Sequence, residues 1–297
     1  MIEAHTITLE LGGHWYGQYG TAPCPVCQPE RRLDQNALTL CDGADKLLVH
    51  CKKLNCRYQD ILFAAGLRSG DFAPPDEAII AQRKRQQKIE AERRSAQAKR
   101  LWSECLPISG SIAETYLRRR GIACDLASTL RFHGHCWHGP TAKCYAALVA
   151  LVEGSSGFAV HRTYLREDGS GKASLNQEKL LLGASSGGSV RLANGSGPLI
   201  VGEGIETTLS AFILLGEKNA NAWAALSSSA LSGLQLPRLP DKLIIAADSD
   251  DSGVGSSAAK KLADKANAAG WSVMLWPAPS GMDWNDVLVK SRGVVCW

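Results

Sequence analysis

The chain of 297 residues has room for two or three small domains, and its 45% hydrophobic content excludes global disorder. Its net charge of +4 is modest. No stretch approaches the roughly 18 consecutive apolar residues of a membrane span, and the N-terminus lacks the basic-then-apolar pattern of a signal peptide. We therefore expect a cytoplasmic protein with no membrane partner, in which clustered cysteines bind metal rather than form disulfides.

The N-terminal part of the chain contains two close cysteine pairs separated by 23 residues. In a structural zinc site of this pattern each pair forms a turn, and four thiolates complete a tetrahedron. The sequence therefore predicts a zinc ribbon with four ligands: Cys24, Cys27, Cys51 and Cys56.

Around these pairs we predict a strand over residues 46–51 and a helix over residues 58–65. Cys41 lies between the pairs beside an Asp-Gly turn and is not predicted as a ligand. His50 is the alternative ligand if one cysteine does not take part.

A helix free of proline and glycine is predicted over residues 76–102. Its eight Lys/Arg against four Asp/Glu account for the whole net charge of the chain. Two interpretations stay open: a solvated connecting helix with side-chain ion pairs, or an arm that contacts nucleic-acid phosphates.

Ser111 and Glu114 form a capping-box pattern at the start of a further helix, and Gly121 is placed to end it in the left-handed conformation. Residues 133–138 contain three histidines and a cysteine, which we interpret as a loop rather than a second metal site. A strand follows over residues 146–152. Residues 158–166 and the turn after them predict a hairpin.

Two apolar runs in the C-terminal third each end in carboxylates. The first run ends at Glu203, and the second ends at Asp248 and Asp250. A short apolar run bounded by polar residues and glycine is typical of a buried parallel strand. Because open α/β sheets bind ligands at the C-terminal ends of their strands, neighbouring strands would bring these acids together.

Three carboxylates so close repel one another unless a cation lies among them. Their oxygen atoms favour Mg²⁺ or Mn²⁺. The alternative is that they are ordinary strand-end acids at helix N-termini. The alternation of strand and helix over residues 198–290 predicts a parallel sheet with helices on both faces.

This arrangement resembles the Toprim domain, which is shared by bacterial-type DNA primases, topoisomerases and some nucleases. In that family a Glu after the first strand and an Asp-x-Asp after a later strand hold divalent metal for phosphoryl transfer. The matching positions here are Glu203, Asp248 and Asp250. The resemblance implies a Rossmann-like α/β fold over about the last hundred residues.

A zinc ribbon ahead of a Toprim domain resembles the architecture of bacterial and phage DNA primases, whose ribbon helps recognise single-stranded template. The resemblance implies RNA primer synthesis on single-stranded DNA from nucleoside triphosphates, with structural Zn²⁺ and catalytic Mg²⁺ or Mn²⁺. It also implies a standalone enzyme of a phage, plasmid or other mobile genetic element. Primase ribbons often include a histidine ligand, whereas the four matching positions here are all cysteine.

By this resemblance the middle of the chain is the basic N-terminal half of a primase core, of mixed α+β structure. The four predicted segments are the zinc ribbon (residues 14–66), a basic helical linker (67–106), the basic half of the core (107–196) and the Toprim catalytic domain (197–297). Arg162, Lys172 and Lys179 would face the triphosphate or the template, although they equally fit the exposed face of a meander.

The resemblance also implies roles for the acids. Asp248 and Asp250, with Asp251, would hold the catalytic metal, and Glu203 would ligate metal or accept the proton of the 3′-hydroxyl. The remaining acids are second-tier candidates. Glu206 would orient basic neighbours. Asp283 and Asp286 would lie near the metals or cap the last helix.

The sequence contains no Gly-x-x-x-x-Gly-Lys-Ser/Thr loop, so we expect a replicative helicase to act in trans. Two rival functions stay open: a Toprim-type nuclease or topoisomerase-like enzyme, and a non-catalytic adaptor that binds single-stranded nucleic acid. A strand-passing topoisomerase needs a nucleophilic Tyr in a separate domain, and the six tyrosines here lie in the ribbon and the central unit.

Overall fold

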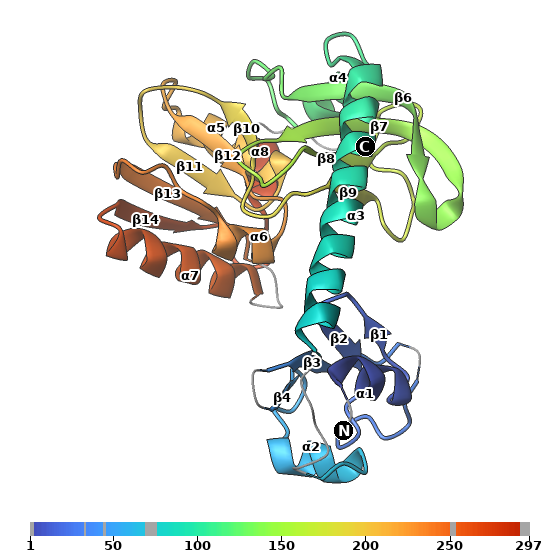
Figure 1. The fold of residues 1–297 in the computed structure, drawn as a ribbon. Helices are drawn as coiled ribbons and strands as arrows, with labels where there is room; N and C mark the ends of the chain where they lie inside the picture. The colour runs from blue at the N-terminus through green and yellow to red at the C-terminus, as the bar shows by residue number, and fades with distance from the viewer. Residues whose placement is uncertain (1–2, 33, 44–45, 69–75, 250–253, 292–297) are drawn as a thin grey trace. The chain divides into compact units, whose positions relative to one another are not determined.

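The computed structural model describes residues 3–32, 34–43, 46–68, 76–249 and 254–291. The chain divides into two compact units, Met1–Glu90 and Ala91–Trp297 (Figure 1). The division falls inside the long helix α3 (Glu77–Glu104), which confirms the helix predicted over residues 76–102.

Four short antiparallel strands form the sheet of the first unit, in the order β1-β2-β3-β4. Their bounds are β1 (His14–Trp15), β2 (Tyr19–Ala22), β3 (Leu38–Asp42) and β4 (Leu47–Cys51). In β4, Leu47 and Cys51 are buried whereas Leu48 and His50 are exposed, because successive side chains of a strand point to opposite faces. The strand predicted over residues 46–51 is therefore confirmed.

The buried face of this sheet packs against two short helices, α1 (Ala4–Glu10) and α2 (Tyr58–Ala64). Ile7 and Ile61 are among the residues that fill the core between sheet and helices. The second helix was predicted from the sequence. The first was not predicted, because its β-branched run Thr6, Ile7 and Thr8 favours a strand over a helix.

The second unit contains two five-stranded sheets. The first sheet is antiparallel throughout and has the order β5-β6-β7-β8-β9. Its strands are β5 (Leu106–Pro107), β6 (Leu130–His138), β7 (Lys143–Val152), β8 (Ala159–Tyr164) and β9 (Lys179–Gly183), with a short 3₁₀ helix, η1 (Gly139–Thr141), between β6 and β7. After β8 the Arg166 amide donates to the Gly171 carbonyl at 3.0 Å, which confirms the predicted turn.

The loop predicted for residues 133–138 is wrong, because these residues complete strand β6. The pairing with β7 shifts register between His133 and Cys136, so the extra residues are accommodated as a bulge. Cys136 and His138 are buried, whereas Trp137 between them is exposed. The bulge interrupts the strand alternation and explains why the pattern was not recognised.

Helix α4 (Ile112–Arg119) follows β5 and has the predicted ends. The Ser111 hydroxyl accepts from the Glu114 amide at 3.3 Å, and the Glu114 carboxylate accepts from the Gly110 amide at 2.7 Å. Gly121 has a φ of +75°, as the left-handed end of the helix requires.

The second sheet has the order β10-β12-β11-β13-β14. Its strands are β10 (Val190–Ala193), β11 (Leu199–Gly202), β12 (Asn221–Ala224), β13 (Lys242–Ala247) and β14 (Ser272–Pro277). The last four are parallel, as predicted, and β10 is an antiparallel edge strand that the sequence reasoning did not identify.

Helices cover both faces of this sheet, which confirms the predicted α/β architecture. Helices α5 (Ile205–Leu215) and α8 (Trp284–Ser291) pack on one face through Ala211 and Trp284. Helices α6 (Ser228–Gly233) and α7 (Val254–Ala268) pack on the other face. Strand alternation decides which helix pair each strand residue packs against. Ile200 and Ile244 point to the first helix pair, and Val201 and Ile245 point to the second.

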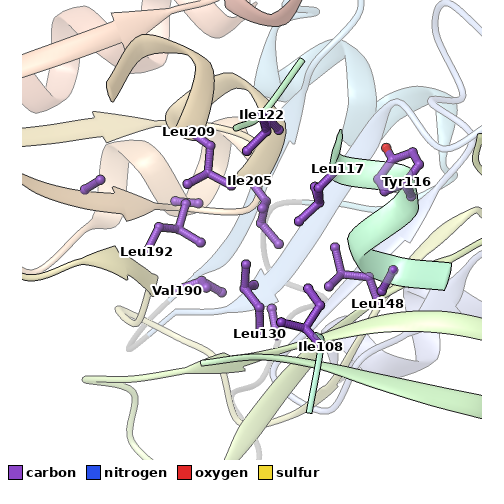
Figure 2. Close-up of a cluster of buried hydrophobic side chains, with 14 of the residues drawn as sticks. Ile108, Tyr116, Leu117, Ile122, Leu130, Leu148, Val190, Leu192, Ile205 and Leu209 are labelled. Carbon is purple, nitrogen blue, oxygen red and sulfur yellow. The ribbon is translucent and has the colours of Figure 1, made fainter. Parts of the chain in front are cut away.

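One hydrophobic core joins the two sheets of the second unit (Figure 2). Leu148 from β7 and Leu117 from α4 meet Val190 from β10 and Leu209 from α5. Full burial of each such side chain contributes about 1.5–3 kcal/mol, so this shared core holds the antiparallel sheet firmly against the parallel one.

Candidate functional site

The carboxylates predicted at two strand ends lie together at one edge of the parallel sheet. Strands β11 and β13 are parallel neighbours with Gly202 opposite Ala246, so Glu203 and Asp248 leave the sheet at the same edge. Both line a cavity of about 430 Å³. The other lining residues are Ser249, Gly255, Gly281, Met282, Asp283 and Asp286.

Asp248 is the most perturbed acid of this cavity. Its burial, together with the carboxylates of Asp283 and Glu203, raises the pKa of Asp248 to about 6. The Thr207 hydroxyl donates to Asp248 Oδ2 at 3.1 Å, whereas Oδ1 is buried and has no partner among the described residues. An unpartnered carboxylate oxygen beside further carboxylates fits a divalent cation with oxygen ligands.

Glu203 is held by a residue that sequence reasoning missed. The Ser228 hydroxyl, at the start of α6, donates to Glu203 Oε2 at 2.8 Å. Neither Ser228 nor Thr207 belongs to a motif that spacing alone would identify. The one available signal was the run of three serines directly after a predicted strand.

The last helix begins at the same cavity. The Asp286 amide donates to Asp283 Oδ1 at 2.7 Å, and the Asp283 amide donates to Asp286 Oδ2 at 3.2 Å, so the two acids cap α8 reciprocally. The segment before them is tied to the end of β13, since the Gly281 amide donates to the Ser249 carbonyl at 3.0 Å. The sequence left open whether these acids cap a helix or lie near the metals; the structure shows that they cap α8 and line the cavity, and their role toward a metal stays a prediction.

Asp250 and Asp251 lie outside the described residues. Their roles as metal ligands therefore stay predictions from the sequence.

Glu206 lies one helical turn beyond Glu203 but makes different contacts. It is buried, its Oε1 accepts from the Tyr116 hydroxyl at 2.6 Å, and its Oε2 lies 3.5 Å from Lys179 Nζ. Burial would raise the pKa of Glu206, but the Lys179 ammonium and the Tyr116 hydroxyl outweigh it and lower the pKa to about 2. Burial lowers the pKa of neighbouring His161 to about 4, with Lys179 acting in the same direction.

The three predicted basic contacts have different surroundings. Lys179, in β9, is partly exposed and paired with Glu206 across the shared core. Lys172 forms an ion pair with Glu178. Arg162 is only 8% exposed, and its guanidinium donates to the Trp137 carbonyl at 3.2 Å and the Leu181 carbonyl at 3.4 Å. The structure thus buries Arg162 in the antiparallel sheet against carbonyls of β6 and β9, and its contact with a triphosphate or template stays a prediction.

The four predicted cysteines of the first unit form a compact cluster. All four sulfur atoms lie within 4.8 Å of one another, those of Cys24, Cys27, Cys51 and Cys56. Zinc–sulfur bonds of about 2.3 Å in a tetrahedron place sulfurs about 3.8 Å apart, so this spacing fits zinc. Burial would raise the pKa of Cys51, but the amides of Cys56, Leu54 and Lys53 outweigh it and lower the pKa to about 6. Cys41 and His50 lie outside the cluster.

Comparison with protein families divides the second unit between two models. Residues 198–293 match the Toprim domain, and residues 92–192 match a domain of unknown function (DUF7146). The C-terminal part of the chain is therefore a Toprim domain, as predicted. No curated protein matches the chain.

Several solved primase structures are similar to the chain at low identity. The zinc-binding and RNA polymerase domains of the Aquifex aeolicus primase are 14% identical, with 98% of this chain and 80% of that chain covered and a TM-score of 0.43. The RNA polymerase domain of Mycobacterium tuberculosis primase DnaG is 15% identical over 67% of this chain and 78% of that chain, with a TM-score of 0.36. A DNA primase domain from Pseudomonas aeruginosa is 17% identical over 62% and 56%, with a TM-score of 0.34.

None of the helices in the described part of the chain is both long enough and apolar enough to cross a membrane.

Proposed function

We propose that the protein is a DNA primase that synthesises short RNA primers on single-stranded DNA by metal-dependent nucleotidyl transfer. The observation that carries this proposal is the Toprim cavity, in which Glu203 and Asp248 converge from neighbouring strands beside Asp283. A chain that combines such a cavity with an N-terminal four-cysteine cluster has the domain order of bacterial and phage primases.

The donor set of the cavity fits Mg²⁺ or Mn²⁺, because all its candidate ligands are carboxylate oxygens. Asp248 and Asp250, with Asp251, would hold the metal. When bound, the cation would bind the triphosphate and neutralise charge at the reacting phosphorus. Glu203, held by Ser228, would ligate metal or accept the proton of the primer 3′-hydroxyl.

Basic residues of the antiparallel sheet would contact the incoming nucleotide or template. Lys179 is the best placed, because Glu206 holds its ammonium group next to the turn that follows Glu203. Lys172 would contribute if its ion pair with Glu178 opens. Because Arg162 is buried, its contribution would be to support strand β6 at Trp137.

The exposed face of the zinc ribbon is suited to single-stranded template. The Tyr16 and Tyr19 rings stack with centroids 5.2 Å apart, and they are 52% and 43% exposed. His14 packs edge-on to Tyr16 at 4.7 Å, and His50 is exposed on the same sheet face. Exposed aromatic rings are suited to stacking with the unpaired bases of a single strand.

Primer synthesis is the direct test. The full chain is incubated with mixed-sequence single-stranded DNA, labelled nucleoside triphosphates and Mg²⁺ or Mn²⁺, beside the variants Glu203→Gln and Asp248→Asn. Asp264→Asn, at an exposed acid on α7 outside the cavity, is the matched control. We expect short labelled oligonucleotides from the wild type and the control, and none from the two site variants.

Other outcomes would point to the rival functions. Nicking of supercoiled plasmid without nucleotides, and without primer synthesis, would assign the cavity to a nuclease. Tight DNA binding by all variants, with no product even after addition of a replicative helicase, would favour the non-catalytic adaptor.

A further inference from the structure

Glu203 is contacted at two points by the segment that follows strand β12. The Leu226 amide donates to the Glu203 carbonyl at 2.7 Å, and the Ser228 hydroxyl donates to Glu203 Oε2 at 2.8 Å. The preceding residue continues this contact, since the Ala225 amide donates to the Gly202 carbonyl at 2.9 Å. One short segment therefore sets both the backbone position and the side-chain direction of the same acid.

The backbone of this segment is strained where it makes the contact. Leu226 has a φ of +79°, a conformation that is unfavourable for a branched side chain. Its side chain packs against the core shared by the two sheets, and Ser227 caps the next helix by accepting from the Ala230 amide at 3.1 Å. Strain of this kind persists where the surrounding structure enforces it, and it concentrates at functional sites.

The second acid of the cavity has an equivalent contact from the opposite face of the sheet. Thr207, in the first turn of α5, is 4% exposed, and its hydroxyl donates to Asp248 Oδ2. The other oxygen, Oδ1, is buried without a partner among the described residues. Each carboxylate thus has one oxygen engaged by a hydroxyl, and its second oxygen is the one a cation would take.

We propose that Ser228 and Thr207 are positioning residues that orient Glu203 and Asp248 toward a divalent cation in the cavity. This inference rests on the proposed metal-dependent function of the cavity. Hydrogen bonds from outer-shell groups hold metal ligands in one orientation, and their loss typically lowers metal affinity or activity 10–100-fold. The two hydroxyls would act through the carboxylates without touching the substrate.

The test measures Mn²⁺ binding to the full chain by calorimetry, so that its readout does not depend on catalysis. Ser228→Ala and Thr207→Val remove the two hydroxyls with little change in shape, whereas Ser228→Thr and Thr207→Ser retain them. Ser229→Ala, at the exposed next residue of α6, is the control. We expect the Kd for Mn²⁺ to rise about tenfold in Ser228→Ala and Thr207→Val, and to stay near the wild-type value in the other three.

Thermal unfolding without metal and primer synthesis over a Mg²⁺ titration complete the experiment. A purely structural role would lower the Tm and leave the Kd unchanged, and that result would overturn the inference. Primer synthesis by the wild type, with unaltered Mn²⁺ binding in both hydroxyl-free variants, would overturn the inference and leave the primase proposal intact. Weakened Mn²⁺ binding in a protein that makes no primers would support the inference and remove the primase proposal.

Discussion

The two candidate metal sites of the molecule are built in opposite ways. The cysteine cluster takes its four candidate ligands from two short segments: Cys24 and Cys27 follow β2, and Cys51 and Cys56 lie at and after the end of β4. The Toprim cavity takes its acids from the ends of β11 and β13 and from the start of α8, so its described acids span residues 203–286. The first site depends on local spacing along the chain, and the second depends on strand order in a sheet.

This difference has an energetic consequence. Thiolates bound to zinc in a small domain supply folding energy, because the unfolded chain has no preformed site. The Toprim cavity instead gathers like charges, and the raised pKa of Asp248 shows that folding disfavours its ionised form. Without metal, the cysteine site should collapse, whereas the carboxylate site should become more stable when a charge is removed.

The largest expected effect is at the cysteine cluster. Cys24→Ser should release zinc and unfold the first unit, because about 10–16 kcal/mol of metal-binding free energy is coupled to folding in such sites. Zinc content after dialysis and limited proteolysis measure this. Cys41→Ser, a cysteine of β3 outside the cluster, should keep both zinc and protease resistance. Full zinc content in Cys24→Ser would contradict the assignment.

The next prediction concerns a substitution that should lower activity and raise the stability of the metal-free protein. Asp248→Asn should lower primer synthesis at least a hundredfold, in line with the loss of a key electrostatic group. The same change should raise the stability of the metal-free protein by about 1–3 kcal/mol, because it removes a charge that burial, Asp283 and Glu203 all disfavour. Urea unfolding in a chelating buffer measures the gain. If Asp248→Asn instead lowers the stability of the metal-free protein, the charge of Asp248 does not destabilise the fold.

Folding favours the ionised form of Glu206, in contrast to that of Asp248. Its pKa is lowered from 4.5 to about 2, so its ionised form stabilises the fold above pH 4.5, and this contribution disappears as the pH falls toward 2. This pKa difference corresponds to about 3 kcal/mol of folding free energy. Glu206→Gln should therefore be less stable than the wild type at pH 7, and the gap should close in acid.

Urea unfolding at several pH values between 7 and 2 measures this gap. Glu217→Gln, at an exposed glutamate just beyond α5, should follow the wild-type curve. Parallel curves for the wild type and Glu206→Gln would rule out the role of the Lys179 and Tyr116 contacts.

The smallest expected effect concerns the ribbon surface. Tyr16→Ala and Tyr19→Ala should each weaken binding of a single-stranded oligonucleotide by about 1–3 kcal/mol at constant salt, because each removes one base-stacking ring. Fluorescence anisotropy measures the affinity, and zinc content should not change. Phe63→Ala, at an aromatic side chain of α2 that is 86% exposed, is the control. Equal losses in all three variants would mean that the rings act through general hydrophobicity.

The sequence by itself determined those features that depend on short-range chemistry. The cysteine spacing identified the cluster, the apolar runs identified β11 and β13, and the turn chemistry identified both ends of α4. Because parallel strands expose their carboxyl ends at one edge, the meeting of Glu203 and Asp248 also followed from the pattern.

Only the tertiary structure decided which neighbours these acids have. The hydroxyls of Thr207 and Ser228 reach the cavity because α5 and α6 begin at adjoining strand ends on opposite faces of the sheet. Lys179 and Glu206 are 27 positions apart in the chain and meet only across the shared core. Contacts of this kind depend on strand order, register and burial, and a single sequence carries no local signal for them.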